Sequence, residues 1–274
     1  SIMFTWLSDH SLAVLLTVSA AFTYWWLWRC RERLRLDRRL AALALAVGHI
    51  FIGLFSVKAF AVLEAFDMGA MGSMSLFGAV FFMPLVYWAF AKLSGRSAAD
   101  VFDVFTVCLV FTLMCARLNC IISGCCLGAH IPIEGLTHLR FPTRELELIF
   151  YVILLSRLWR KVLSGSARGM IYPIYMIAYG IFRFVTETLR VSSRANNILH
   201  ISHLWALLSL GVGMSIYGEL QKKEKKTGGR RNEKTDRQAL GVAAPDVCHS
   251  TDDASGDDAA GAGGDQRTRD RFSR

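Results

Sequence analysis

Residues 102–123 read FDVFTVCLVFTLMCARLNCIIS, and this stretch decides the class of fold. It is a nearly unbroken apolar run of about 20 residues, the length that an α-helix needs to cross the hydrocarbon core of a bilayer. Reading outward in both directions gives seven such windows, at 11–28, 41–63, 68–91, 102–123, 146–164, 170–189 and 198–217. The sequence therefore predicts an all-α, polytopic membrane protein with seven transmembrane helices.

The composition agrees with a chain that is integral to a membrane. Of its 274 residues, 53% are hydrophobic, and the mean hydropathy is +0.37. A soluble domain of this length would be less apolar. The net charge is +9, but the basic residues gather in particular connections between the predicted spans. We interpret this pattern as a signal of membrane orientation and predict no nucleic-acid partner.

Lysine and arginine concentrate in alternate connections. They follow the first, third, fifth and seventh predicted spans, as Arg29, Arg31, Arg33, Arg35, Arg38 and Arg39; Lys92 and Arg96; Arg157, Arg160, Lys161 and Arg168; and Lys222, Lys223, Lys225, Lys226, Arg230 and Arg231. Connections rich in these residues stay on the cytoplasmic side. We therefore expect the N-terminus outside and the C-terminus in the cytoplasm. The first span also lacks a preceding basic segment, which favours a retained span over a cleaved signal.

The chain divides by composition into two parts. Residues 1–218 hold the seven predicted spans, whereas residues 219–274 are basic at first and then rich in Gly, Ala and Asp. Such a segment buries too little apolar surface to order itself. We expect a membrane domain over 1–218 and a disordered cytoplasmic tail over 219–274.

Ionisable groups inside the sixth predicted span mark the first candidate site. Tyr179, Arg183, Glu187 and Arg190 recur at helical spacings and share one face. Arg183 and Glu187 can pair, and Arg190 would lie near the outer interface. A guanidinium is a planar, two-pronged donor that suits a phosphate group. The alternative is a structural ion pair that fixes helix packing, and the spacing alone favours neither.

Two more cations and a group of cysteines lie in or beside other spans. Arg117 in the fourth span either joins an anion site or extends its side chain to the interface. Lys58, within the second span, is a candidate ligand for a lipid head group or a partner of a carboxylate inside the bundle. Cys120, Cys125 and Cys126 fall at the outer end of the fourth span and form a possible thiol site. Their spacing with His130 and His138 matches no standard zinc pattern, so we predict no metal.

At this point the motifs resemble the prolipoprotein diacylglyceryl transferase family, over roughly residues 20–215. The nearest match is Tyr179-Gly180-Ile181-Phe182-Arg183-Phe184 with Glu187 and Arg190. Ala116-Arg117-Leu118-Asn119-Cys120 through Gly128 is similar to the family signature Gly-Arg-x-Gly-Asn followed by Asn-Gly-Glu-x-x-Gly. Pro142-Thr143 with Glu147, Ile201 to Leu204, and Ser56 to Leu63 resemble further family segments.

The resemblance implies a function. The family moves a diacylglyceryl group from phosphatidylglycerol to the cysteine thiol of a lipoprotein precursor, at the outer face of the bacterial inner membrane. It implies catalytic roles for Arg117, Arg183 and Glu187, and substrate binding by Lys58, Gly124, Gly128, Tyr179 and Arg190. The expected partners are phosphatidylglycerol or another anionic phospholipid and lipoprotein precursors, and no cofactor is expected.

One difference from the family pattern keeps an alternative open. Phe77 stands where the family places a histidine that is proposed to assist the thiol, and phenylalanine cannot take a proton. Cys120 and Cys125 likewise replace an Asn and a Glu. The alternative is a catalytically impaired relative that binds anionic phospholipid or organises other membrane proteins. A third hypothesis is a thiol-based activity of the cysteine group.

Overall fold

The computed structural model describes residues 2–65, 75–125, 128, 138–191 and 201–239. Within these residues every regular element is a helix, so the all-α prediction is confirmed. The helices are α1 (Ile2–Arg29), α2 (Arg31–Leu34), α3 (Arg39–Ala65), α4 (Phe77–Phe81), α5 (Met83–Leu93), α6 (Ala98–Ile122), α7 (Thr143–Ser164), α8 (Ile171–Val191) and α9 (Ile201–Ala239).

Four helices in the described part of the chain are long and apolar enough to cross a membrane. The segments are His10–Arg29, Arg39–Glu64, Ala98–Ile122 and Ile201–Thr227. On α3, the side chains of Phe51 and Phe55 are 68% and 64% exposed, as expected for a surface that faces hydrocarbon. α7 carries more charged residues than α3 or α6 does. The count of seven spans and the orientation of the termini stay predictions.

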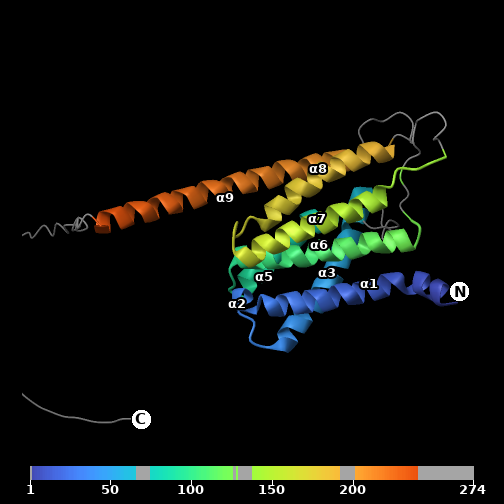
Figure 1. Ribbon diagram of the computed structural model, residues 1–274, viewed down its shortest axis with the longest axis horizontal. Coiled ribbons are helices and arrows are strands. Elements are labelled where there is room, and N and C mark those ends of the chain that lie inside the picture. Colours follow the sequence, from blue (N-terminus) through green and yellow to red (C-terminus); the bar gives the residue numbers. More distant parts are fainter. Residues whose placement is uncertain (1, 66–74, 126–127, 129–137, 192–200, 240–274) are drawn as a thin grey trace, which may run out of the picture. The chain divides into compact units, whose positions relative to one another are not determined.

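α6 occupies the centre of the bundle. It contacts α1, α5, α7 and α8, and Figure 1 shows α1, α6 and α7 running side by side. Its buried side chains include Val104, Val107 and Val110. Because α6 packs on several sides, a group placed on it can reach partners from several helices. α6 is the stretch from which the fold was predicted.

The third predicted span, 68–91, is not one continuous helix. Residues 68–74 lie outside the described part, and the remainder is divided into α4 and α5 just before Pro84. Proline has no N–H to donate to the carbonyl four residues earlier, which belongs to Val80. The Tyr172 hydroxyl from α8 lies 2.6 Å from that oxygen and donates to it instead. A neighbouring helix thus satisfies the carbonyl that the proline leaves free.

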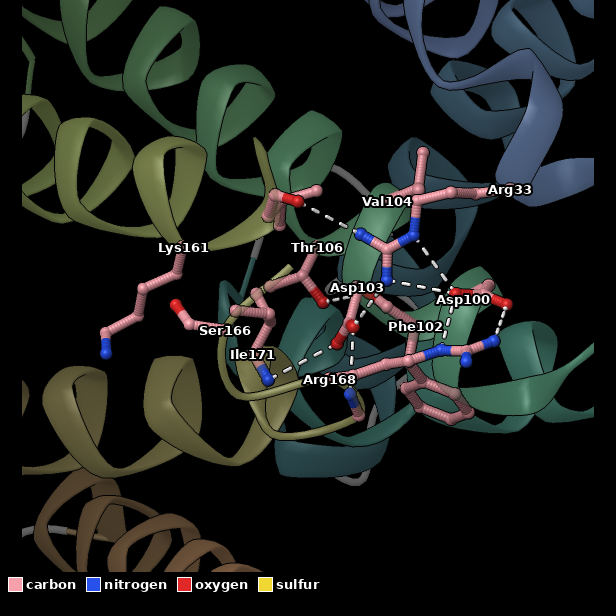
Figure 2. Close-up of polar contacts among 12 residues, drawn as sticks. Arg33, Asp100, Phe102, Asp103, Val104, Thr106, Lys161, Ser166, Arg168 and Ile171 are labelled. Carbon is pink, nitrogen blue, oxygen red and sulfur yellow. Dashed lines mark hydrogen bonds and ion pairs between the residues drawn. The ribbon is translucent and has the colours of Figure 1, made fainter. Parts of the chain in front are cut away.

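Two aspartates at the start of α6 bind the ends of several elements together. We call Asp100, Asp103 and their two arginines, Arg33 and Arg168, the aspartate cluster. Arg33 donates to both carboxylates at 3.0 Å, and Arg168 Nε donates to Asp100 at 3.0 Å. Figure 2 shows both carboxylates among these donors. From the sequence, Arg33 and Arg168 were predicted only to mark connections on the cytoplasmic side, and the two aspartates were not predicted to have a role.

Asp103 also caps α8 from a different helix. Its carboxylate accepts hydrogen bonds from the backbone N–H of Gly169 at 2.8 Å and of Ile171 at 3.4 Å. The first N–H groups of a helix have no partner within that helix, and a negative charge there is favourable. Asp103 therefore fixes where α8 begins, and with it the position of the residues further along α8.

The first part of the segment predicted as a disordered tail is helical. α9 continues to Ala239, so residues 219–239 are helical in the structure, whereas disorder was predicted from residue 219. A run of Lys, Glu and Gln has good helix propensity, which explains the continuation. Residues 240–274 lie outside the described part. The division at residue 218 stays a prediction.

Removing the Asp103 carboxylate should destabilise the bundle strongly. In Asp103→Ala, Arg33 loses a buried partner and two backbone N–H groups lose their acceptor, so we expect a loss of about 3–5 kcal/mol. The matched control is Glu219→Ala, which removes the exposed pair between Glu219 and Lys222 and should cost about 0–1 kcal/mol. Thermal unfolding of both variants in one detergent measures the difference. Equal midpoints would contradict a central role for Asp103.

Candidate functional site

Two arginines and two glutamates from α6, α7 and α8 form a connected set of ion pairs. We call Arg117, Glu147, Arg183 and Glu187 the Arg–Glu network. Glu147 Oε2 pairs with Nε of Arg117, while its Oε1 accepts a hydrogen bond from Nη1 of Arg183 at 3.0 Å. Nη2 of Arg183 lies 2.9 Å from Oε2 of Glu187. Arg117 and Arg183, expected to act together, meet on the same carboxylate.

The order of the helices explains how these four side chains meet. Arg117 lies near the end of α6 and Glu147 near the start of α7. α6 and α7 pack antiparallel, so the end of one faces the start of the other. Arg183 and Glu187 are one turn apart on α8, and the pairing predicted from that spacing is present. The network therefore joins three helices at the end of α6 opposite the aspartate cluster.

The whole network is withdrawn from the surface. Arg117, Glu147 and Glu187 are 7%, 4% and 8% exposed, and the side chain of Arg183 is 12% exposed. Two positive and two negative groups balance, which reduces the cost of burying each charge. Arg117 thus points into the bundle, and its alternative placement at the interface does not occur in the structure.

Glu147 is the site residue that sequence reasoning missed. In the sequence, Glu147 appears only as part of a family-like segment, with no role assigned to it. In the structure, it is the one described carboxylate that contacts both arginines of the network. A signal was present, since Glu147 falls at the beginning of the predicted span 146–164, where an unpaired carboxylate would be costly.

An aromatic pair borders the network. Tyr179 lies one turn before Arg183 on α8, is 2% exposed, and its hydroxyl has no hydrogen-bond partner among the described residues. The ring of Phe77 packs edge-to-face against Tyr179 with 5.7 Å between centroids. A buried hydroxyl without a partner costs free energy. It is therefore a donor that an oxygen atom of a ligand can use.

Of the described cysteines of the possible thiol site, Cys120 lies in the last turn of α6 and Cys125 lies just after that helix. Cys120 is partly buried and Cys125 is exposed, and neither forms a disulfide within the described part of the chain, while Cys126 lies outside the described residues. Arg144 donates to the backbone carbonyls of Cys120 and Cys125 at 3.4 and 3.3 Å. Arg144 thus holds this turn against α7. Among the residues that the structure describes, no three His, Cys, Asp or Glu side chains gather as a metal ion would require.

The remaining predicted substrate-binding residues are less closely grouped. Lys58 is partly exposed on α3 and makes no ion pair within the described part of the chain. Gly124 has a φ of +70°, which favours glycine. A side chain at Gly128 would collide with the carbonyl of Phe141, so glycine permits that close approach. Arg190 lies in the last turn of α8, but its side chain is outside the described residues.

Comparison with known proteins gives the family. The family model described as prolipoprotein diacylglyceryl transferase matches residues 7–218. The chain therefore belongs to this family of transferases. One relative is a phosphatidylglycerol–prolipoprotein diacylglyceryl transferase from Clostridium tetani, which is 23% identical over 155 residues. That alignment covers 52% of this chain and 62% of the relative's length, so the chain spans less than two thirds of this curated relative.

Glu147 should contribute more to stability than its neighbour Glu145. In Glu147→Ala, two buried guanidinium groups lose their shared partner, and we expect a loss of about 3–5 kcal/mol. Glu145 is 43% exposed on its side chain and pairs only with the adjacent Arg144, so Glu145→Ala should cost about 0–1 kcal/mol. Thermal unfolding of the two variants in the same detergent compares them. A smaller loss for Glu147→Ala would show that the network does not hold the helices together.

Proposed function

We propose that this protein moves a diacylglyceryl group from phosphatidylglycerol to the cysteine thiol of a lipoprotein precursor, at the outer face of the bacterial inner membrane. The observation that carries the proposal is the Arg–Glu network, in which Arg117 and Arg183 from two helices contact one buried carboxylate. Family membership supports the reaction type.

In this proposal the two arginines bind the phosphate of the donor lipid. The network is balanced without a ligand, so an incoming phosphate competes with Glu147 for the same guanidinium groups. Glu187 remains paired with Arg183 and keeps it in position. Tyr179 donates its free hydroxyl to a lipid oxygen, and Arg190 guides the head group at the interface. Lys58, Gly124 and Gly128 would contribute to the surroundings of the bound lipid.

The chemical step would be a substitution at the glyceryl carbon. The thiolate sulfur of the acceptor forms a bond to that carbon, and the carbon–oxygen bond to the phosphate breaks. The electron pair leaves with the oxygen as glycerol phosphate, which gains one negative charge. Guanidinium groups in a water-poor interior stabilise that developing charge, a term that is often the largest in catalysis. The thiol proton must pass to a base, since the thiolate is the nucleophile.

Phe77 favours a second candidate function. It is 2% exposed and packs against Phe60, Phe81 and Tyr179. The position where the family places a histidine is therefore part of an aromatic core in this chain, and the phenylalanine there cannot accept a proton. The second candidate is a catalytically impaired relative that binds an anionic phospholipid at the network without transferring its diacylglyceryl group, or that organises other membrane proteins.

Transfer should depend on Arg183. Purified protein in vesicles with labelled phosphatidylglycerol and a peptide carrying a lipoprotein cysteine should form a thioether-linked lipid product. Arg183→Ala should lower the rate about 100–1,000-fold, the usual cost of losing one charge-stabilising donor. Arg183→Lys retains the positive charge but lacks the two-pronged donor, and should also be slow while remaining folded.

The control is Arg160→Ala, because Arg160 is exposed on α7 and, within the described part of the chain, bonds only to the backbone of Ser156. It should leave the rate unchanged. If the wild-type protein forms no product above the level of Arg183→Ala, the transferase proposal is wrong. Phosphatidylglycerol that co-purifies with the wild type but is lost in Arg183→Ala, without turnover, would then support the second candidate.

A histidine at position 77 should distinguish the two candidates further. In Phe77→His an imidazole would lie beside Tyr179, where it can accept the thiol proton. General base catalysis is worth about 100-fold or more, so we expect the transfer rate to rise, most at a pH below the thiol pKa. Phe77→Leu is the control for changed packing. No difference in rate between the two variants would contradict a missing base as the limiting factor.

A further inference from the structure

An apolar recess in the bundle lies away from the Arg–Glu network. It is a groove of about 410 Å³ between α4, α5, α6, α8 and α9. We call it the lower groove, and its lining includes Val80, Ala99, Tyr172, Met176, Val212 and Ile216. Its lining includes Ala98 and Ala99 at the start of α6 and Gly169, which follows Arg168 in the sequence. It therefore lies at the same end of α6 as the aspartate cluster.

The inside of the lower groove is suited only to hydrocarbon. Tyr172 carries the single polar side-chain group in its described lining. Its hydroxyl is already bonded to the carbonyls of Val80 at 2.6 Å and Ala79 at 3.1 Å. A ligand inside the groove would find no polar side chain to bind, so its buried part must be apolar. Hydrocarbon chains are available everywhere around a membrane helix, so selectivity has to arise at the mouth of the groove.

Exposed basic side chains lie beside the mouth of the lower groove, with the acidic Glu219 and Glu224 nearby on α9. On α9, Val212, Ile216 and Leu220 line the groove at four-residue intervals. Lys223 follows Leu220 by three residues and Ile216 by seven, so it continues the same helix face. Lys223 is exposed. Arg168 adjoins the lining residue Gly169, and its side chain remains 61% exposed although it pairs with Asp100.

We propose that the lower groove binds one acyl chain of an anionic phospholipid, with Lys223 and Arg168 contacting its phosphate. Lysine near an anionic head group is favourable, and an apolar groove with basic side chains beside its mouth suits such a lipid. The site is distinct from the network. Arg117 and Asp100 are separated by roughly 25 Å along α6 at 1.5 Å per residue. The proposal does not depend on the transferase function.

Photo-crosslinking can test this site directly. The full-length protein is reconstituted into vesicles that contain phosphatidylglycerol with a photoreactive acyl chain, or phosphatidylcholine with the same chain. Peptide mapping by mass spectrometry locates the labelled residues. We expect the phosphatidylglycerol probe to label the groove segments 98–102 and 169–176 more than the phosphatidylcholine probe does. Lys223→Glu should reduce this labelling about fivefold or more.

Lys225→Glu is the matched control. It makes the same charge change on the same helix, but two residues correspond to about 200°, which turns Lys225 to the opposite side of α9. It should leave the labelling unchanged, as should Arg183→Ala at the distant network. Ala99→Trp should lower the labelling by filling the groove.

Three outcomes would overturn the proposal. Equal labelling by both lipids would mean that any lipid of the surrounding bilayer occupies the groove, without a preference for the anionic head group. Equal effects of Lys223→Glu and Lys225→Glu would assign the preference to the general charge of α9. Labelling by neither lipid, together with protein–protein crosslinks at the groove, would identify a second copy of the chain as its occupant.

Discussion

The buried Glu147 carboxylate is the contact on which the arrangement of the functional helices depends. Its two oxygens are divided between a guanidinium from α6 and another from α8, and Glu147 itself belongs to α7. A charge in this position has no water to solvate it, so each partner becomes expensive to remove. The same property makes the network responsive, because an anion that enters must take over contacts that the carboxylate now holds. Helix packing and ligand binding therefore use the same groups.

Both ends of α6 carry buried charged groups, but the groups at the two ends have different roles. At its start, Asp100 and Asp103 have their partners supplied by arginines, by the N–H of Gly169 just before α8 and by the first N–H of α8. Near its last turns, Arg117 shares its carboxylate with Arg183, and the hydroxyl of the nearby Tyr179 is without a partner in the described part of the chain. Fully bonded polar groups mainly fix a structure, whereas buried groups with spare bonding capacity are positioned for a ligand. The aspartate cluster thus positions α8, and α8 presents the groups that bind.

Local patterns predicted most of the fold and part of the site. Apolar windows gave the helical class, and the spacing of Arg183 and Glu187 gave their ion pair, because both depend on residues near each other in sequence. The shared role of Glu147 was missed, since it depends on how α6, α7 and α8 meet. Asp100 and Asp103 escaped notice for the same reason, as their partners lie about 65–70 residues away. The division of the third span depends on Pro84 and on Tyr172 of α8, which satisfies the carbonyl that the proline leaves free, and that contact joins residues far apart in sequence. The helical continuation of α9 was missed because composition was given more weight than helix propensity.

The hydrogen bond from the Tyr172 hydroxyl to the Val80 carbonyl has an evolutionary consequence. Pro84 removes one donor from the backbone, and Tyr172 replaces it from another helix. A lineage that lost only the tyrosine would leave a buried carbonyl without a donor, whereas one that lost only the proline would regain the backbone donor and free the tyrosine to vary. The two positions should therefore change in a fixed order, with the proline first, and descendants that retain Pro84 should also retain a donor at position 172.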